Sequence, residues 1–371
     1  MRVAGVAGLV WLLSGVLRRW RVERVWPVRI GLVGYGKGGR FFHAPLIAAA
    51  AGCELAGVVT RSAGRRAELE GDYPGTPAYD DLAQLAADGV DAVAISTPAD
   101  THVPLVAQAV SLGLPVVCDK PFALQSAAAR QALEEAERAG VPLTVYQNRR
   151  FDADLLTVRA VIDSGELGRV TRFESRIEQY TPPDGIPSSG GGILLDLGAH
   201  VVDQALVLFG PVTSVYAELD DAGGRPGRFF IAVRHAGGVA SHLVGDLVLQ
   251  GAPGRRFRVF GTLASYDVDA FDGQADELMA GGSPAAAGGA WGVVPRERWG
   301  RLHAGHTTRP WPSERGDWTV FYASFADAVR GGGGVPVDPW DAVSGLEVLE
   351  AAQRSAVTGQ VVTLGPDTAM G

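Results

Sequence analysis

The feature that most constrains this chain is a glycine-rich segment directly after a short apolar run, residues 28–33. Gly34, Gly36 and Gly39 follow that run in the pattern Gly-x-Gly-x-x-Gly. In folds of alternating strands and helices, the first glycine permits a tight turn and the second lets the backbone approach a pyrophosphate. The third lets the next helix pack against the strand, and that helix start offers N–H groups to phosphates. The residues that we expect to contact a dinucleotide here are Gly34, Gly36, Lys37, Gly38 and Gly39.

A second apolar run, residues 55–60, ends about 20 residues further on, where such folds read the ribose of the dinucleotide. A carboxylate at that place would bind the ribose 2′-hydroxyl and repel a 2′-phosphate. This chain has Thr60, Arg61 and Ser62 instead. A guanidinium pairs well with a phosphate, and hydroxyls can donate to it. We therefore predict NADP as the preferred cofactor, with NAD as the alternative; an exposed basic helix start would give the same pattern.

Length and charge limit the class of protein. A chain of 371 residues favours two domains, and a net charge of −8 with pI near 5.4 argues against nucleic-acid binding or an anionic membrane surface. Cys53 and Cys118 stand far apart inside apparent strands, and the histidines have no metal-ligand spacing. We expect reduced thiols, no metal site and a cytoplasmic location.

The N-terminal part does not match a standard targeting signal. Residues 3–17 are apolar and are followed by Arg18, Arg19 and Arg21. The run is shorter than the roughly 18 residues of a spanning helix, and no clean cleavage site separates it from residue 28. We expect residues 1–27 to be an extension outside the fold, with a peripheral membrane anchor as the alternative.

The order of apolar runs predicts two different domains. Residues 28–148 alternate strand and helix, which indicates an α/β domain with a doubly wound parallel sheet of the Rossmann type. In residues 149–364, strands follow one another on short turns, which indicates an α+β domain with a largely antiparallel, open sheet. Residues 190–209 predict one glycine-opened helix in this half, and residues 281–289 a surface loop. Residues 365–371 are expected to be a tail.

Three polar segments stand at places where chemistry is possible. Lys120 follows an apolar strand and precedes a proline, so its side chain would point into the cleft at the carboxyl edge of the sheet. Asp196 and His200 are spaced i, i+4 on the predicted helix, an arrangement in which a carboxylate orients a general acid or base. Residues 146–152 place polar groups at the domain junction. Taken singly, each segment is also typical of a surface lysine, a surface ion pair or an inter-domain salt-bridge cluster.

The order of the motifs resembles one family. The glycine motif is followed by Thr97-Pro98 with His102, then by Asp119-Lys120-Pro121, and then by Asp196-x-x-x-His200. This order, over residues 28–364, resembles the glucose–fructose oxidoreductase/inositol dehydrogenase (Gfo/Idh/MocA) family. Residues 36–46, 146–152 and 273–276 look like its NADP-linked scyllo-inositol dehydrogenase branch.

The resemblance implies a mechanism. It implies oxidation of a secondary alcohol of a cyclic polyol or sugar, or the reverse reduction, with hydride passing to nicotinamide. His200 would take the hydroxyl proton, Lys120 would bind and polarise the same oxygen, and Asp196 would orient His200 or contact a neighbouring hydroxyl. Thr97, Pro98, His102 and Lys120 would lie against the cofactor. The substrate contacts would come from Lys120, Asn148, Arg149, Tyr180, Asp196 and His200.

The chain departs from the family at three places. Asp119 stands where the family usually has glutamate, and Gln147 stands where the inositol branch has histidine. Residues 180–189 lack the arginine and tryptophan of that branch. The identity of the substrate is therefore open.

Other functions remain as alternatives. A non-catalytic nucleotide-sensing regulator belongs to another class, but the chain has Lys120, Asp196 and His200 together. An enzyme with an internally recycled cofactor, as in redox-assisted glycoside cleavage, and a tetrapyrrole reductase are further possibilities. The resemblance also implies a homo-oligomer that binds a small molecule.

Overall fold

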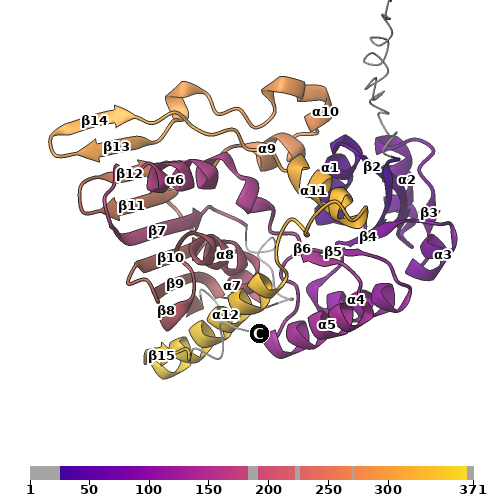
Figure 1. Cartoon of the computed structure of the whole chain (residues 1–371), viewed down its shortest axis with the longest axis horizontal. Coiled ribbons are helices and arrows are strands. Elements are labelled where there is room, and N and C mark those ends of the chain that lie inside the picture. The colour runs from indigo at the N-terminus through magenta and orange to yellow at the C-terminus, as the bar shows by residue number, and fades with distance from the viewer. Residues whose placement is uncertain (1–25, 183–190, 222–225, 270, 366–371) are drawn as a thin grey trace, which may run out of the picture.

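The computed structural model describes residues 26–182, 191–221, 226–269 and 271–365. Two sheets lie side by side in Figure 1, the first with its helices at the right and the second at the left. The predictions for residues 1–25 and 366–371 lie outside the described residues.

The first sheet is parallel, and its strand order is β3-β2-β1-β4-β5-β6. The order reverses between β1 and β4, so the loops after these two strands diverge and leave a crevice at the carboxyl edge of the sheet. The strands are β1 (Val28–Val33), β2 (Cys53–Val59), β3 (Ala78–Tyr79), β4 (Ala92–Ile95), β5 (Val116–Cys118) and β6 (Leu143–Val145). This arrangement confirms the predicted Rossmann sheet.

Helices cover both faces of this sheet. They are α1 (Ala44–Ala49), α2 (Ala63–Asp72), α3 (Leu82–Ala87), α4 (His102–Ser111) and α5 (Ser126–Ala139). Before α1, residues 38–43 form a π-helical segment. Pro45 explains the change of helix type, since it has no N–H to give to a carbonyl one turn back.

The second sheet has the strand order β14-β13-β12-β11-β7-β10-β9-β8-β15. Neighbouring strands are antiparallel except β7 and β10, which are parallel, because two helices and a hairpin separate them along the chain. The strands are β7 (Val170–Glu178), β8 (Val212–Asp221), β9 (Pro226–His235), β10 (Ala240–Asp246), β11 (Phe257–Gly261), β12 (Ser265–Val268), β13 (Arg301–Ala304), β14 (Thr307–Pro310) and β15 (Val362–Thr363). The prediction of a largely antiparallel sheet is confirmed.

The helices of the second half pack on both sheets. Helices α8 and α12 lie against β8–β10, whereas α11 returns to the first domain and packs against α1 and β2. One buried cluster accordingly combines Ile30 and Leu46 of the first domain with Phe321 and Phe325 of α11. The helices are α6 (Ala153–Asp163), α7 (Gly192–Asp196), α8 (Gly198–Phe209), α9 (Gln274–Met279), α10 (Pro284–Ala287), α11 (Thr319–Val329) and α12 (Trp340–Thr358).

Two element predictions were wrong. The single helix expected over residues 190–209 is divided at Leu197 into α7 and α8, and residue 190 lies outside the described residues. The loop expected over residues 281–289 contains α10, whose first turn is capped by the Ser283 hydroxyl.

The stretch Gly192–Phe209 is also the one place in the described residues that could span a membrane by length and composition. Buried residues make up 67% of it, as in the core helix of a folded domain.

Candidate active site

A cleft of about 610 Å³ lies between the carboxyl edge of the parallel sheet and the second sheet. Its volume is in the range of small-molecule sites. The predicted site residues that line it are Lys37, Gly38, Lys120, Asn148, Arg149, Asp196 and His200. The remaining lining residues, which the sequence did not predict as contacts, are Phe42, Asp119, Tyr146, Ile177, Gln179, Thr181, Leu197, Leu247, Phe271, Asp272, Gly273, Ala275, Asp276, Met279 and Trp318.

The glycine-rich turn has the backbone that a dinucleotide needs. Gly34 has φ of 102°, and a Cβ there would lie 2.3 Å from the Ser96 carbonyl oxygen. A Cβ at Gly39 would lie 2.1 Å from the Gly34 carbonyl oxygen, so both positions require glycine. Gly36, in contrast, has no atom within 4 Å of its Cβ position. The open side of the turn therefore fits the phosphates of a dinucleotide.

The end of β2 carries the residues predicted to distinguish the cofactors. Arg61 is exposed, and its Nε donates to the Asp80 carbonyl oxygen at 3.1 Å. Ser62 caps α2 by accepting from the Arg65 N–H at 3.4 Å. Arg66 pairs with the Asp80 carboxylate at 2.7 Å. Arg61 and Arg66 therefore lie near Thr60, and the Asp80 carboxylate is ion-paired with Arg66.

Lys120 contacts Asp196 through two oxygens. Its Nζ donates to the carboxylate Oδ1 at 2.6 Å and to the main-chain carbonyl oxygen at 3.0 Å. The His200 N–H donates to the Leu197 carbonyl at 3.1 Å. Since the Asp196 carbonyl is bound to the ammonium, the helix is interrupted after Asp196. The Asp196 carboxylate pairs with Lys120 and makes no hydrogen bond to His200 among the described residues, so of its two predicted roles the geometry favours contact with a neighbouring substrate hydroxyl.

His200 lies in a positively charged part of the cleft. The residue is 7% exposed, and its Nδ1 is buried without a hydrogen-bond partner among the described residues. Burial lowers its pKa well below the usual 6.5, and the charges of Lys120, Arg149 and Arg256 lower it further. His200 is therefore neutral at pH 7 and can accept a proton.

Asp119 connects the lysine loop to the glycine-rich helix. Its carboxylate accepts from Ser96 Oγ at 2.9 Å and from the Lys120 N–H at 2.8 Å. The buried His43 ring lies with Nε2 3.2 Å from Asp119 Oδ2 and with Nδ1 2.6 Å from the Tyr322 hydroxyl. Burial alone would raise the Asp119 pKa, but His43, Lys120 and His102 hold it below its usual range. With aspartate in place of glutamate, the loop still brings Lys120 to Asp196.

Two polar residues follow β6 into the cleft. Asn148 is 8% exposed, and Arg149 donates from Nη1 to Asp152 at 3.0 Å. The Arg149 Nε is buried and bonds to no described residue. Both residues line the cleft, where their side chains can contribute polar groups.

The structure places four other predicted contacts outside the lining of the cleft. Tyr180 is 58% exposed and does not line the cleft; its neighbours Gln179 and Thr181 do, because side chains alternate along an extended segment. His102 is 1% exposed, and both of its ring nitrogens face backbone carbonyls, so the ring cannot bind the cofactor directly. Thr97 and Pro98 lie in the loop after β4 but do not line the cleft of 610 Å³.

The second domain contributes lining residues to the cleft that the sequence did not predict. Trp318, 1% exposed, stacks edge-on against Phe42 at 6.1 Å between ring centroids and donates from Nε1 to Asp152 at 2.7 Å. Asp276, near the start of α9, also lines the cleft, and α9 packs on the π-helical segment. The likeness of residues 273–276 to the family gives no indication that this segment lies in the cleft.

The scarcity of lysine supports a role for Lys37 and Lys120. Of the 33 lysine and arginine residues, only these two are lysine. Both line the cleft. A chain that otherwise uses arginine retains lysine where a compact ammonium is needed, because the planar guanidinium is not an equivalent group.

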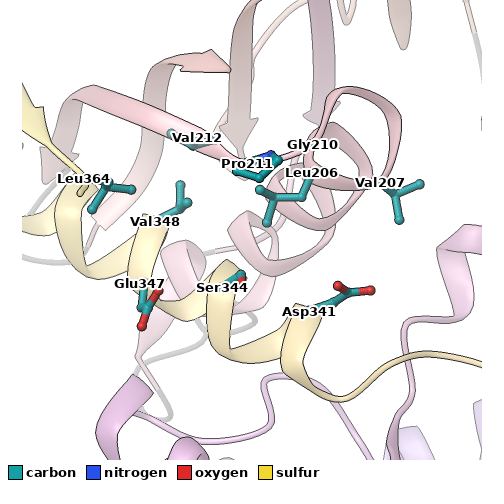
Figure 2. A pocket seen from close by; sticks show the side chains of 10 residues that line it. All are labelled: Leu206, Val207, Gly210, Pro211, Val212, Asp341, Ser344, Glu347, Val348 and Leu364. Atoms are coloured by element: carbon teal, nitrogen blue, oxygen red, sulfur yellow. The ribbon is translucent and has the colours of Figure 1, made fainter. Parts of the chain in front are cut away.

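A second cavity, of about 160 Å³, lies between the end of α8 and α12 (Figure 2). Its two acidic residues are already paired, Asp341 with Arg150 at 2.9 Å and Glu347 with Arg130 at 2.7 Å. We assign no ligand to it. Within the described residues, no group of three His, Cys, Asp or Glu side chains could hold a metal ion.

Comparison with known families gives two matches. A family described as "Oxidoreductase family, NAD-binding Rossmann fold" (GFO_IDH_MocA) matches residues 28–147, and the GFO/IDH/MocA C-terminal domain matches residues 155–267. These matches confirm the predicted resemblance and the predicted oxidoreductase class.

Individual proteins match over most of the chain. The uncharacterized oxidoreductase YdgJ of Escherichia coli (strain K12) is 34% identical over 89% of this chain and 96% of its own. The scyllo-inositol 2-dehydrogenase (NADP(+)) IolW of Bacillus subtilis is 27% identical over 92% and 97%. The solved structure of an oxidoreductase from Yersinia pestis has a TM-score of 0.84 with 33% identity, over 91% of this chain and 97% of that one.

Proposed function

The chain belongs to the Gfo/Idh/MocA family of NAD-binding oxidoreductases, and we propose that it oxidises a secondary alcohol of a cyclic polyol or sugar with NADP as the preferred cofactor. The reverse reduction of the ketone uses the same groups. The observation that carries the proposal is the Lys120–Asp196 pair beside a neutral His200, in a cleft that begins at the glycine-rich turn.

The turn around Gly36 fits the cofactor phosphates, and Lys37 and Gly38 continue that surface into the cleft. When bound, the nicotinamide supplies the hydride acceptor; the protein has to place the alcohol carbon against it and manage the proton.

Lys120 binds the substrate oxygen. An ammonium has three N–H donors. Two of them go to Asp196, and the third, which has no partner among the described residues, can donate to the hydroxyl oxygen. As the alcohol becomes a ketone, charge develops on that oxygen, and a fixed ammonium stabilises it. Asp196 positions the ammonium and balances its charge.

His200 accepts the hydroxyl proton. Its low pKa leaves the ring unprotonated at neutral pH, so the imidazole of this cleft-lining residue can take up a proton. The proton moves from the substrate hydroxyl to the imidazole as the hydride leaves. In the reverse reaction the imidazolium donates this proton to the ketone oxygen, and the nearby positive charges favour that transfer.

NADP preference is supported by the end of β2. No carboxylate occupies residues 60–62, Arg61 is exposed, and the nearby Asp80 is neutralised by Arg66. A 2′-phosphate would pair with Arg61 and accept from Ser62. The similarity to a relative named for NADP(+) agrees with this choice.

A polyol is supported by the walls of the cleft. Asn148, Arg149, Gln179 and Thr181 offer hydrogen-bonding groups, while Ile177 and Leu247 give an apolar surface for a ring. Relatives are named for scyllo-inositol, inositol and D-apiose, all polyhydroxy compounds. We also propose that the enzyme is a cytoplasmic homo-oligomer; the free thiols of Cys53 and Cys118 agree with a reducing compartment.

The test is titration of the purified protein, starting near residue 22, with NADPH and NADH by nicotinamide fluorescence. The same samples are then assayed for absorbance change with inositols, aldoses and their keto forms. Tight NADPH binding with turnover of one of these compounds, lost in Lys120→Ala, supports the proposal. Tight binding without net oxidation or reduction contradicts it and points to a sensor or an internally recycled cofactor.

A further inference from the structure

His102 is the first residue of α4. Its side chain lies between two loops of the first domain, one after β4 and one after β5. Its ring is 1% exposed, with Nδ1 2.8 Å from the Pro121 carbonyl oxygen and Nε2 2.8 Å from the Thr97 carbonyl oxygen. Carbonyl oxygens only accept hydrogen bonds. A neutral imidazole has one N–H and one lone pair, so it would direct that lone pair at a carbonyl oxygen. Only the imidazolium donates to both.

His235 provides a contrast within the same chain. It is 2% exposed, with Nδ1 2.7 Å from the Gly210 carbonyl oxygen and Nε2 2.8 Å from the Ser241 hydroxyl. A hydroxyl can donate as well as accept, so the neutral ring satisfies both partners. Burial also lowers the pKa of His235. The two histidines are equally buried and differ in what they contact.

Negative charge nearby stabilises a buried imidazolium, and Asp119 is a carboxylate that interacts electrostatically with His102. His102 is among the positive groups that lower the pKa of Asp119, whose carboxylate also accepts from Ser96 and from the Lys120 N–H. Besides His102, α4 carries no charged side chain. The charged groups on the elements packed around α4 are Asp100 in the turn before it, Asp119 and Lys120 after β5, and Arg130, Glu134, Glu135, Glu137 and Arg138 on α5.

We propose that His102 is a positioning residue, held as an imidazolium, that ties the cofactor loop after β4 to the lysine loop after β5. Thr97 lies against the glycine-rich turn, because a Cβ at Gly34 would lie 3.0 Å from Thr97 Cγ2. Pro121 directly follows Lys120. The two hydrogen bonds of His102 therefore fix the distance between the dinucleotide turn and the ammonium that binds the substrate oxygen. Loss of one ring proton would replace one bond by repulsion and let the loops separate.

The charge state is tested by ¹⁵N NMR of the protein labelled at its seven histidines. Spectra at pH 7.5 distinguish doubly protonated rings from neutral ones, and His102→Gln and His235→Gln assign the two signals. We expect His102 to be doubly protonated and His235 to carry a single proton. A neutral His102 at this pH overturns the proposal, whether or not the enzyme proposed above is active.

The positioning role is tested by NADPH affinity, which requires no substrate. Glutamine cannot donate to both carbonyls, so we expect His102→Gln to weaken NADPH binding about tenfold, as for loss of one charge-assisted hydrogen bond. The wild-type affinity should also fall at alkaline pH, and that pH dependence should be absent from the variant. His235→Gln is the control and should bind NADPH as the wild type does. If NADPH affinity depends on pH in the same way in His102→Gln and in the wild type, His102 does not hold the two loops together through its charge. If His102→Gln does not fold, the NMR spectrum of the wild type still determines the charge state of His102.

Discussion

The Lys120 ammonium binds the Asp196 main-chain carbonyl as well as its carboxylate, at 3.0 Å and 2.6 Å. The interruption between α7 and α8 and the placement of the lysine are therefore one feature. Among the described residues, the Asp196 carbonyl accepts from the ammonium and not from a helical N–H. The ammonium thereby has a second acceptor that holds it in the cleft.

Lys120→Ala should lower turnover by about 10² to 10⁴-fold, because the variant lacks the group that stabilises charge on the substrate oxygen. NADPH affinity, measured by fluorescence, should change little. Lys120→Arg should not restore activity, since a planar guanidinium cannot make the same contacts with Asp196. Near-normal turnover in either variant would refute the role of Lys120.

The pH dependence of kcat/KM should reflect His200. Because burial and three positive charges lower its pKa, the acid limb for alcohol oxidation is expected below pH 6.5. In Lys120→Met one of these charges is gone, so the His200 pKa should rise and the acid limb of the residual activity should move to higher pH. An unchanged or lower limb in that variant would contradict the electrostatic account.

Arg61→Ala should weaken NADPH far more than NADH, by about 10 to 100-fold for a lost charge-assisted contact to phosphate. Fluorescence titration with both cofactors measures the ratio. Arg138→Ala removes an exposed arginine from the end of α5 and is the matched control. Equal loss for both cofactors would show that Arg61 does not read the 2′-phosphate.

Gly36→Ala and Gly39→Ala should separate binding from folding. The Cβ position of Gly36 is open, so alanine there should change the free energy of unfolding by less than about 0.5 kcal/mol but obstruct the dinucleotide. Alanine at Gly39 would meet the Gly34 carbonyl and should cost about 1–3 kcal/mol or more. Urea unfolding and NADPH titration of both variants check this; a stable Gly36→Ala protein with normal NADPH affinity would place the cofactor elsewhere.

Asp119→Asn should destabilise the protein by about 1–3 kcal/mol at pH 7, since a charged acceptor of several hydrogen bonds is lost. The folded-state pKa of Asp119 is below its unfolded value, so its contribution is present above about pH 4 and is lost as pH falls further. The difference between wild type and variant in urea unfolding should therefore shrink below pH 4. Asp163→Asn, at an exposed site, should show no such pH-dependent difference.

Local sequence patterns were enough to predict the main elements of the fold and the chemical types of the site residues. The glycine spacing and the alternation of apolar runs predicted the Rossmann sheet and the largely antiparallel second sheet, because these depend on short-range backbone and periodicity rules. The order of Lys120, Asp196 and His200 indicated the catalytic candidates.

Which polar groups contact one another could be seen only after the chain was folded in three dimensions. An i, i+4 spacing cannot show that Asp196 turns to a lysine from another domain, nor that both nitrogens of His102 are occupied by carbonyls from two loops. The return of α11 to the first domain and the position of Trp318 beside Phe42 also depend on packing between segments far apart in the chain. Hydrogen-bond partners and charge pairing over such separations are set by the whole fold, because each buried polar group binds the partner that the fold brings within reach.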